Sequence, residues 1–113
     1  MQSSGDIVRL DLGQPAGREA GYLHPAVVIT AQRILDAEPT VIQVVPLTST
    51  LRGFHSEVVI EQDKANGLEQ PSAAQCQHVR AVSPARAVEV LGNVGPFALS
   101  QIRETIAVII DLP

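Results

Sequence analysis

The sequence predicts a mostly β (α+β) fold, in which a small curled sheet or barrel has one helix packed on it. Short alternating or fully apolar runs recur at close spacing, which is typical of β-strands. Val and Ile, whose branched side chains suit a pleated surface, are abundant, whereas Tyr22, Phe54 and Phe97 are the only aromatic residues. A single segment near the C-terminal end has the spacing of an amphipathic helix.

Six segments are predicted to be strands, because each is alternating or apolar and each is bounded by glycine, proline or polar residues. Val8, Leu10 and Leu12 share one face of the first strand, which we expect to be half-buried. The second follows Pro25 and is apolar throughout, which indicates a central strand. In order, the predicted strands are residues 5–12, 26–29, 41–47, 57–61, 72–82 and 87–94.

The segments between these strands are predicted to be loops and turns. Residues 13–24 hold three glycines and one proline without apolar periodicity, so we expect a long loop. Residues 30–39 have room for one helical turn at most, and the polar residues 48–55 form a connection. Residues 64–67 carry a turn signal, and residues 83–86 resemble a short turn.

The predicted helix occupies the last part of the chain. Pro96 suits its first turn, where the missing N–H costs no hydrogen bond. Apolar residues then recur at helical spacing with polar residues between them, and we expect this stripe to pack on the sheet. The stripe consists of Leu99, Ile102, Ile106, Ile109 and Ile110.

With 113 residues, the chain is long enough for one domain, which we place over residues 1–113. The first residues have neither a basic nor an apolar region, so no signal peptide is predicted, and no apolar run could span a bilayer. The single cysteine, Cys76, cannot form an internal disulfide, which fits a reducing cytoplasm. Its apolar neighbours favour a buried structural thiol over a nucleophile or a redox-active group.

Four separated segments, in the right order, resemble the MazF/PemK toxins (mRNA interferases) of type II toxin–antitoxin systems. They are residues 5–8, 17–29, 45–49 and 72–82, and the resemblance extends over nearly the whole chain. It implies a small SH3-like barrel of the CcdB/PemK type with a C-terminal helix. It also implies a homodimer and a cognate MazE-like antitoxin whose tail lies across the RNA groove.

The chemistry implied by this resemblance is sequence-specific cleavage of single-stranded RNA without a metal or other cofactor. The substrate's own 2′-OH attacks the adjacent phosphate, which leaves a cyclic phosphate and a 5′-hydroxyl. A base must take the 2′-OH proton, an acid must protonate the leaving oxygen, and a cation must stabilise the phosphorane. The sequence has no dense His/Cys/Asp cluster at metal-ligand spacing, which agrees with a metal-free route.

Three residues match catalytic positions of these toxins. His24 stands where the family has an arginine before a proline. Because histidine titrates near neutrality, His24 either carries the acid/base step, with activity that depends on pH near neutrality, or marks a weakened site. Thr48 matches a strand-end threonine whose hydroxyl can bond a phosphate oxygen, although a threonine there can simply cap a turn. Glu19 matches an acidic loop residue and could equally be a solvated carboxylate.

The net charge of −4 argues weakly against nucleic-acid binding, so RNA would need a local basic patch built from arginines. Aromatic loop residues could stack unpaired bases or, alternatively, cover the barrel end or pack in the dimer. Polar residues on the strand over 72–82 could read base edges or be ordinary exposed side chains. The predicted RNA-binding residues are Arg18, Tyr22, Ser49, Arg52, Phe54, Gln77, His78 and Arg80.

Two rival hypotheses remain at this point. A CcdB-like topoisomerase poison would share the fold and need no catalytic residues, and a degenerate homologue would only bind an antitoxin. Retention of Thr48 and Glu19 favours the nuclease, whereas histidine at position 24 favours a rival.

Overall fold

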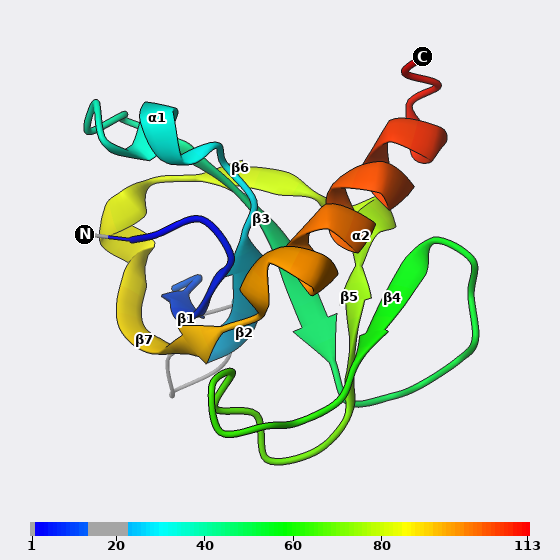
Figure 1. Cartoon of the computed structure of the whole chain (residues 1–113). Helices are drawn as coiled ribbons and strands as arrows, with labels where there is room; N and C mark the ends of the chain where they lie inside the picture. Colours follow the sequence, from blue (N-terminus) through cyan, green and yellow to red (C-terminus); the bar gives the residue numbers. More distant parts are fainter. Residues whose placement is uncertain (1, 14–22) are drawn as a thin grey trace.

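The computed structural model describes residues 2–13 and 23–113, which form a mostly antiparallel sheet with a C-terminal helix (Figure 1). The predicted fold class is therefore confirmed. The strands are β1 (Asp6–Asp11), β2 (Leu23–Val28), β3 (Ile42–Thr48), β4 (Glu57–Ile60), β5 (Ser72–Gln75), β6 (Arg80–Val82) and β7 (Ala87–Asn93). The α-helices are α1 (Gln32–Leu35) and α2 (Gly95–Ile109), and short 3-10 helices span Cys76–His78 and Pro84–Arg86.

The strands pair in the order β4-β5-β3-β2-β1-β7, and β6 pairs with β3 outside this path. Strand β3 changes partners along its length: Ile42 pairs with Val82 of β6, whereas Leu47 pairs with Ala74 of β5. Because one strand serves two sets of neighbours, the sheet curls around β3 (Figure 1).

The central strands are buried on both faces. Ile7, Val27 and Val45 lie in register across β1, β2 and β3 and pack with Ile102 of α2. The alternate residues Val8, Ala26, Val28 and Val44 form a second cluster, which includes Leu35 of α1. This double burial explains the continuous apolar run over 26–29. It also corrects the prediction for the first strand, since Ile7 and Val8 are both fully buried.

Helix α2 packs on the sheet with only the first part of its apolar stripe. Leu99 and Ile102 are buried, but Ile109 and Ile110 are 43% and 56% exposed. Arg103 fixes the helix by donating from Nη2 to the Ile29 carbonyl at 3.0 Å. Beyond that point, the C-terminal end of α2 extends away from the sheet (Figure 1). Ile106 still packs against the core, so the expectation that the whole stripe packs on the sheet is wrong only for Ile109 and Ile110.

Two predicted boundaries are also wrong. Leu23 and His24 belong to β2 rather than to a loop, because the pairing with β1 continues as far as Leu23 opposite Asp11. The predicted strand over 72–82 is broken by the turn Cys76–His78. The turn carries Cys76 into the core and moves the chain from β5, which pairs with β4, to β6, which pairs with the other end of β3.

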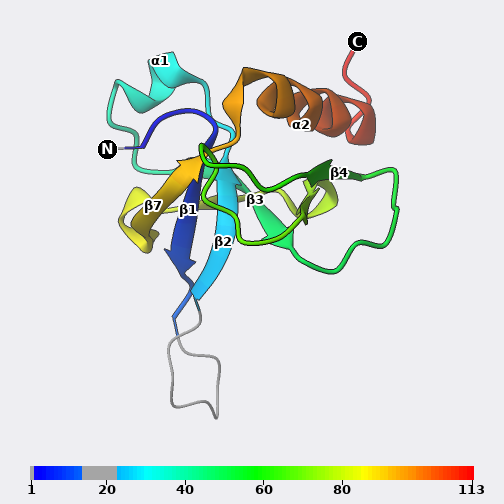
Figure 2. The ribbon, with the colours of Figure 1, turned by 60° about the horizontal axis from the view of Figure 1, so that its bottom comes forward.

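The segment between β4 and β5 is held against β7. Asn66 is buried and its Nδ2 donates to the Glu61 carbonyl at 2.8 Å, while its Oδ1 accepts from the backbone N–H of Leu68 at 3.0 Å. A Cβ at Gly67 would collide with the carbonyl of Leu91, so only glycine permits this contact. Figure 2 shows the segment running from β4 to the end of β7, beside β1 and β2. It therefore forms a fixed wall next to the central strands.

Candidate active site

A cavity of about 510 Å³ lies between the ends of β1, β2 and β3 on one side and the wall after Gly67 on the other. We call it the His24 cavity. It brings together two of the three predicted catalytic residues, His24 and Thr48, with the predicted RNA-binding residue Ser49. Its complete lining is Arg9, His24, Pro25, Leu47, Thr48, Ser49, Gly67, Leu68, Glu69, Gln70, Ser72 and Leu91.

Strand register explains why His24 and Thr48 meet. Ala26 of β2 lies opposite Pro46 of β3 in an antiparallel pair. His24 lies two residues before Ala26 and Thr48 two residues after Pro46, so both lie toward the same end of the strand pair. Side chains two residues apart point to the same face. A motif in β2 and a motif in β3 therefore reach one cavity.

His24 is held in a partly buried environment. Desolvation by burial lowers the pKa of its imidazole, and a hydrogen bond to the backbone carbonyl of Leu47 opposes that effect without cancelling it. The neutral ring, which can act as a base, therefore predominates at neutral pH. Such a ring can accept a proton but supplies no permanent positive charge.

Thr48 combines a turn-capping role with an available donor. Its Oγ1 accepts a hydrogen bond from the backbone N–H of Thr50 at 3.1 Å. Accepting that bond fixes the hydroxyl oxygen while its own O–H can still donate to a phosphate oxygen. The structural and functional interpretations of Thr48 are therefore compatible.

A second cavity of about 360 Å³ adjoins the first at His24, which lines both. We call it the Arg80 cavity, because Arg80 and His78 provide its basic groups. Gln75 is its other polar lining residue, and its floor is apolar, formed by Leu10, Leu12, Val44 and Pro46. An apolar floor with a cation at the edge suits a nucleobase and its phosphate.

Arg52, Phe54 and Gln77 belong to a different group. Arg52 Nη2 donates to Glu57 Oε2 at 2.6 Å, and its guanidinium lies 4.7 Å from the Phe54 ring centroid. Gln77 Nε2 donates to the same carboxylate oxygen at 2.8 Å. Glu57, only 2% exposed in its side chain, is thus the centre of this cluster.

The pKa of Glu57 reflects these contacts. Burial alone would raise it, but hydrogen bonds from Gln77, Arg52 and Gln75 outweigh that effect and hold the pKa below its ordinary value. The carboxylate is therefore charged at neutral pH and compensates the charge of Arg52. With its amide nitrogen committed to Glu57 and its Oε1 buried, Gln77 presents little to a base in this conformation.

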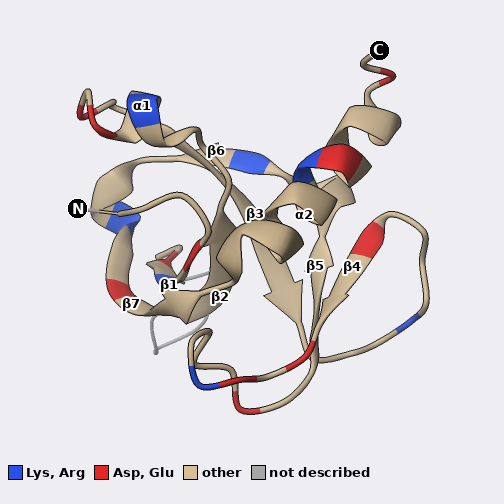
Figure 3. Cartoon of the chain, in the orientation of Figure 1, with Lys and Arg blue, Asp and Glu red and all other residues tan. Residues whose placement is uncertain are grey.

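The predicted arginine patch is therefore only partly assembled. Arg80 lines the Arg80 cavity, and Arg52 is paired with Glu57. Arg18, Glu19 and Tyr22 lie outside the described residues. Figure 3 shows the basic residues spread over several elements rather than gathered on one face. Positive charge near His24 therefore comes from single side chains such as Arg80, not from a broad basic face.

Cys76 is buried, and desolvation raises the pKa of its thiol to about 11, with the Glu57 carboxylate adding to the rise. Thiolate is the nucleophilic form of cysteine, so this residue is not a nucleophile at neutral pH. The prediction of a buried thiol is confirmed.

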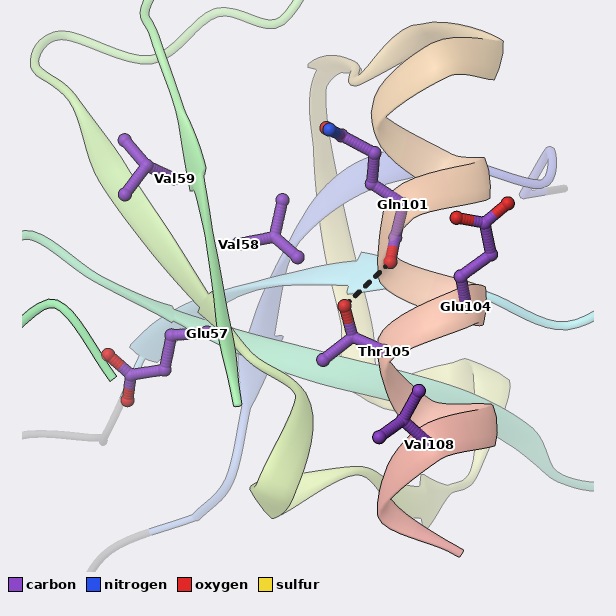
Figure 4. A pocket seen from close by; sticks show the side chains of 7 residues that line it. All are labelled: Glu57, Val58, Val59, Gln101, Glu104, Thr105 and Val108. Atoms are coloured by element: carbon purple, nitrogen blue, oxygen red, sulfur yellow. Dashed lines mark hydrogen bonds between the residues drawn. The ribbon is translucent and has the colours of Figure 1, made fainter. Parts of the chain in front are cut away.

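A third hollow, of about 480 Å³, lies between β4 and α2 and differs in character (Figure 4). Val58, Thr105 and Val108 face it, while the Glu57 carboxylate points away from the helix. Thr105 Oγ1 donates to the Gln101 carbonyl at 2.8 Å within α2. We call it the α2 hollow; its lining of Glu57, Val58, Val59, Gln101, Glu104, Thr105 and Val108 contains no basic residue.

The structure adds residues to the site that sequence reasoning missed. Arg9, Glu69, Gln70 and Ser72 line the His24 cavity. Arg9 is an outward-facing residue of an alternating strand, a pattern that gives no functional signal by itself. The wall residues could not be found, because their place depends on the contact between Gly67 and β7.

In the described part of the chain, no helix is long and apolar enough to cross a membrane.

Comparisons with known proteins agree with this arrangement. Residues 3–110 match the family model described as the PemK-like, MazF-like toxin of type II toxin–antitoxin system. The chain is 31% identical over 117 residues to "Endoribonuclease MazF9" of Mycobacterium tuberculosis, covering 99% of this chain and 98% of that protein.

Solved structures share the fold. A MazE–MazF crystal structure from Deinococcus radiodurans has a TM-score of 0.79 at 21% identity and covers 99% of this chain and 97% of its own. The Mycobacterium tuberculosis toxin MazF-mt6 has a TM-score of 0.75 at 24% identity, covering 96% of this chain and 98% of its own. A mycobacterial endoribonuclease in complex with its cognate antitoxin has a TM-score of 0.78 at 18% identity, covering 100% and 98%.

Proposed function

Because the chain belongs to the PemK/MazF-like toxins of type II toxin–antitoxin systems, we propose that it is a metal-independent endoribonuclease. Its substrate is single-stranded RNA, cut at a short sequence. The relative named endoribonuclease supports the activity. The observation that carries the proposal is the single cavity in which His24 and Thr48 meet.

In the proposed reaction, neutral His24 takes the proton of the substrate's 2′-OH. The 2′-oxygen then forms a bond to the adjacent phosphorus while the bond from phosphorus to the 5′-oxygen breaks. The leaving 5′-oxygen takes up a proton from solvent, which gives a 2′,3′-cyclic phosphate and a 5′-hydroxyl, and protonated His24 returns its proton to solvent. The Thr48 hydroxyl donates to a non-bridging oxygen and holds the phosphate in line.

The lowered pKa of His24 supports the role of a base rather than that of a fixed cation. Glu19 remains a predicted acid/base residue in the segment outside the described residues. The Arg80 cavity adjoins the reaction centre and suits the neighbouring nucleotide, with Arg80 and His78 near its phosphate.

We also propose two protein partners. A cognate MazE-like antitoxin fits the similarity to MazE–MazF complexes, and its binding across the His24 and Arg80 cavities would block RNA. A second copy of the chain would cover the apolar end of α2 and β4. Val59, Val108, Ile109, Ile110 and Leu112 are exposed there, which is costly for a monomer.

The test of the activity is direct. Purified protein is incubated with a long RNA in excess EDTA, and the ends of the products are mapped. Discrete cuts with cyclic phosphate and 5′-hydroxyl ends are expected. A protein that leaves the RNA intact at high molar excess would favour a rival that only binds its targets.

A further inference from the structure

Cleavage by the proposed route needs a permanent positive charge at the phosphorane, and neither His24 nor Thr48 provides one. Among the described residues, Arg9 is the only arginine or lysine that lines the cavity holding both of them. It lies opposite Pro25 in the β1–β2 register, and Pro25 directly follows His24. His24 itself lies opposite Leu10, so Arg9 and His24 leave adjacent strands on opposite faces of the sheet. The cavity at the strand ends, which both residues line, is what brings them together.

The other described arginines near this end of the sheet either bond to other protein groups or line a cavity that Thr48 does not reach. Arg52 is paired with the buried Glu57 and lines neither cavity that contains His24. Arg80 lines the Arg80 cavity, which Thr48 does not line. Arg86 donates to the Asp11 carbonyl at 3.0 Å.

The Arg9 guanidinium is held by one hydrogen bond and is partly exposed to solvent. Its Nε donates to Glu89 Oε1 at 2.9 Å, and the side chain is 40% exposed. Within the described ranges no hydrogen bond engages its two Nη groups. A guanidinium fixed through Nε can present its Nη nitrogens to the oxygens of a phosphate.

We infer that Arg9 is the phosphate-binding cation of this site, contacting the scissile phosphate and its phosphorane through its Nη nitrogens. This inference rests on the proposed function for its reaction, but the phosphate contact can be tested separately. Glu89 orients the guanidinium, and Thr48 contacts another oxygen of the same phosphate. The ion pair itself is exposed, so we expect it to contribute little to folding stability.

The experiment compares Arg9→Gln, Arg9→Lys, Glu89→Gln and Arg33→Gln with the wild type. Arg33 is an exposed residue of α1 outside both cavities, so its variant controls for the change in net charge. Glu89→Gln removes the same ion pair as Arg9→Gln but keeps the guanidinium. Cleavage of a labelled RNA is measured alongside binding of the same RNA made uncleavable by 2′-O-methylation.

Removing one preorganised transition-state donor costs on the order of 100-fold in rate, so Arg9→Gln is expected to lose cleavage to that extent. Arg9→Lys keeps the positive charge but loses the paired nitrogens of the guanidinium, so we expect the cleavage rate to fall about tenfold. Arg9→Gln should also lower the salt dependence of binding by roughly 0.7 in log–log slope, the value for one phosphate contact on a single strand. Arg33→Gln should stay within about threefold of the wild type, because it keeps both Arg9 and Glu89. Glu89→Gln keeps the guanidinium but loses the partner that orients it, so its loss should lie between that of Arg33→Gln and that of Arg9→Gln.

Two results would overturn the inference: an Arg9→Gln variant that retains both cleavage and the salt slope, or a Glu89→Gln variant as damaged as Arg9→Gln. The second would mean that the ion pair matters only for structure. If the wild type cuts no RNA while Arg9→Gln still lowers the salt slope, the proposed function fails and the phosphate contact stands.

Discussion

The His24 cavity and the α2 hollow are similar in size but opposite in chemistry. The first is polar, borders on central strands buried on both faces, and includes a base, a hydroxyl and a guanidinium. The second combines valines and carboxylates without a basic residue, and its surroundings expose Val59 and Val108. Volume therefore says little about function here. The charge of the lining and the rigidity of its strands distinguish the proposed RNA site from the proposed dimer surface.

The largest effect that would test this comparison is expected from His24→Ala. Loss of a general base typically costs about 100- to 10,000-fold in rate, and we expect cleavage to fall within that range. His24→Arg adds a positive charge but removes the base, so it should also lose cleavage if the main role of His24 is proton transfer. Undiminished cleavage by the alanine variant, measured on a labelled oligonucleotide, would remove His24 from the mechanism.

A substitution at the α2 hollow should change self-association. Val108→Lys places a charge on a side chain that is 80% exposed in one chain, so folding should be retained while self-association weakens. We expect sedimentation equilibrium to give a dimer dissociation constant raised by about 100-fold, as for a charge buried unpaired in an interface. Val88→Lys on β7, which is 55% exposed, is the matched control and should leave association unchanged. Equal association of both variants would argue against α2 as the dimer surface.

Thr48→Val should have a smaller effect in the His24 cavity. It removes the O–H donor at nearly constant shape, and losing one hydrogen bond to a charged oxygen costs about 1.5–3 kcal/mol, or roughly 10- to 100-fold in kcat/KM. Because Oγ1 also accepts from the N–H of Thr50, the thermal stability of the variant must be measured in parallel. Thr50→Val, outside the cavity lining, serves as the control.

The smallest predicted effect concerns pH. The pKa of His24 lies below its ordinary value of 6.5, so kcat/KM should rise through an acid limb below that pH and be flat above it. The free energy of unfolding should change in the same direction. Position 24 binds a proton more readily in the unfolded chain, so lowering the pH through this range destabilises the fold. His24→Ala should abolish its part of that stability change. An acid limb centred above 6.5 would contradict the role of a desolvated base.

Much of this comparison could be predicted from the sequence, because it rests on local patterns. Apolar runs predicted the central strands, and the resemblance to MazF/PemK toxins, carried by motifs in β2 and β3, implied that His24 and Thr48 belong to one site. What could not be predicted depends on long-range contacts. His24 lies in β2 only because pairing with β1 extends to Leu23, and the turn at Cys76 breaks an alternation that looks continuous.

Arg9 illustrates the same limit. Its alternating pattern fixes which face of β1 it occupies, but only the folded cavity at the strand ends brings it together with His24 and Thr48. Similarly, Glu57 resembled an ordinary strand residue until Arg52, Gln75 and Gln77 converged on it from separate segments. A sequence pattern identifies the face of an element, whereas the partners across the sheet decide its surroundings.

We propose that RNA binds at the His24 cavity and not at the α2 hollow. NMR titration with a 2′-O-methylated single-stranded RNA tests it directly, by following the imidazole C–H signals of His24 and His78 and the methyl signals of Val108. We expect both imidazole signals to shift with a common affinity while the Val108 methyl signals stay in place. Shifts confined to Val108, with His24 unchanged, would contradict it.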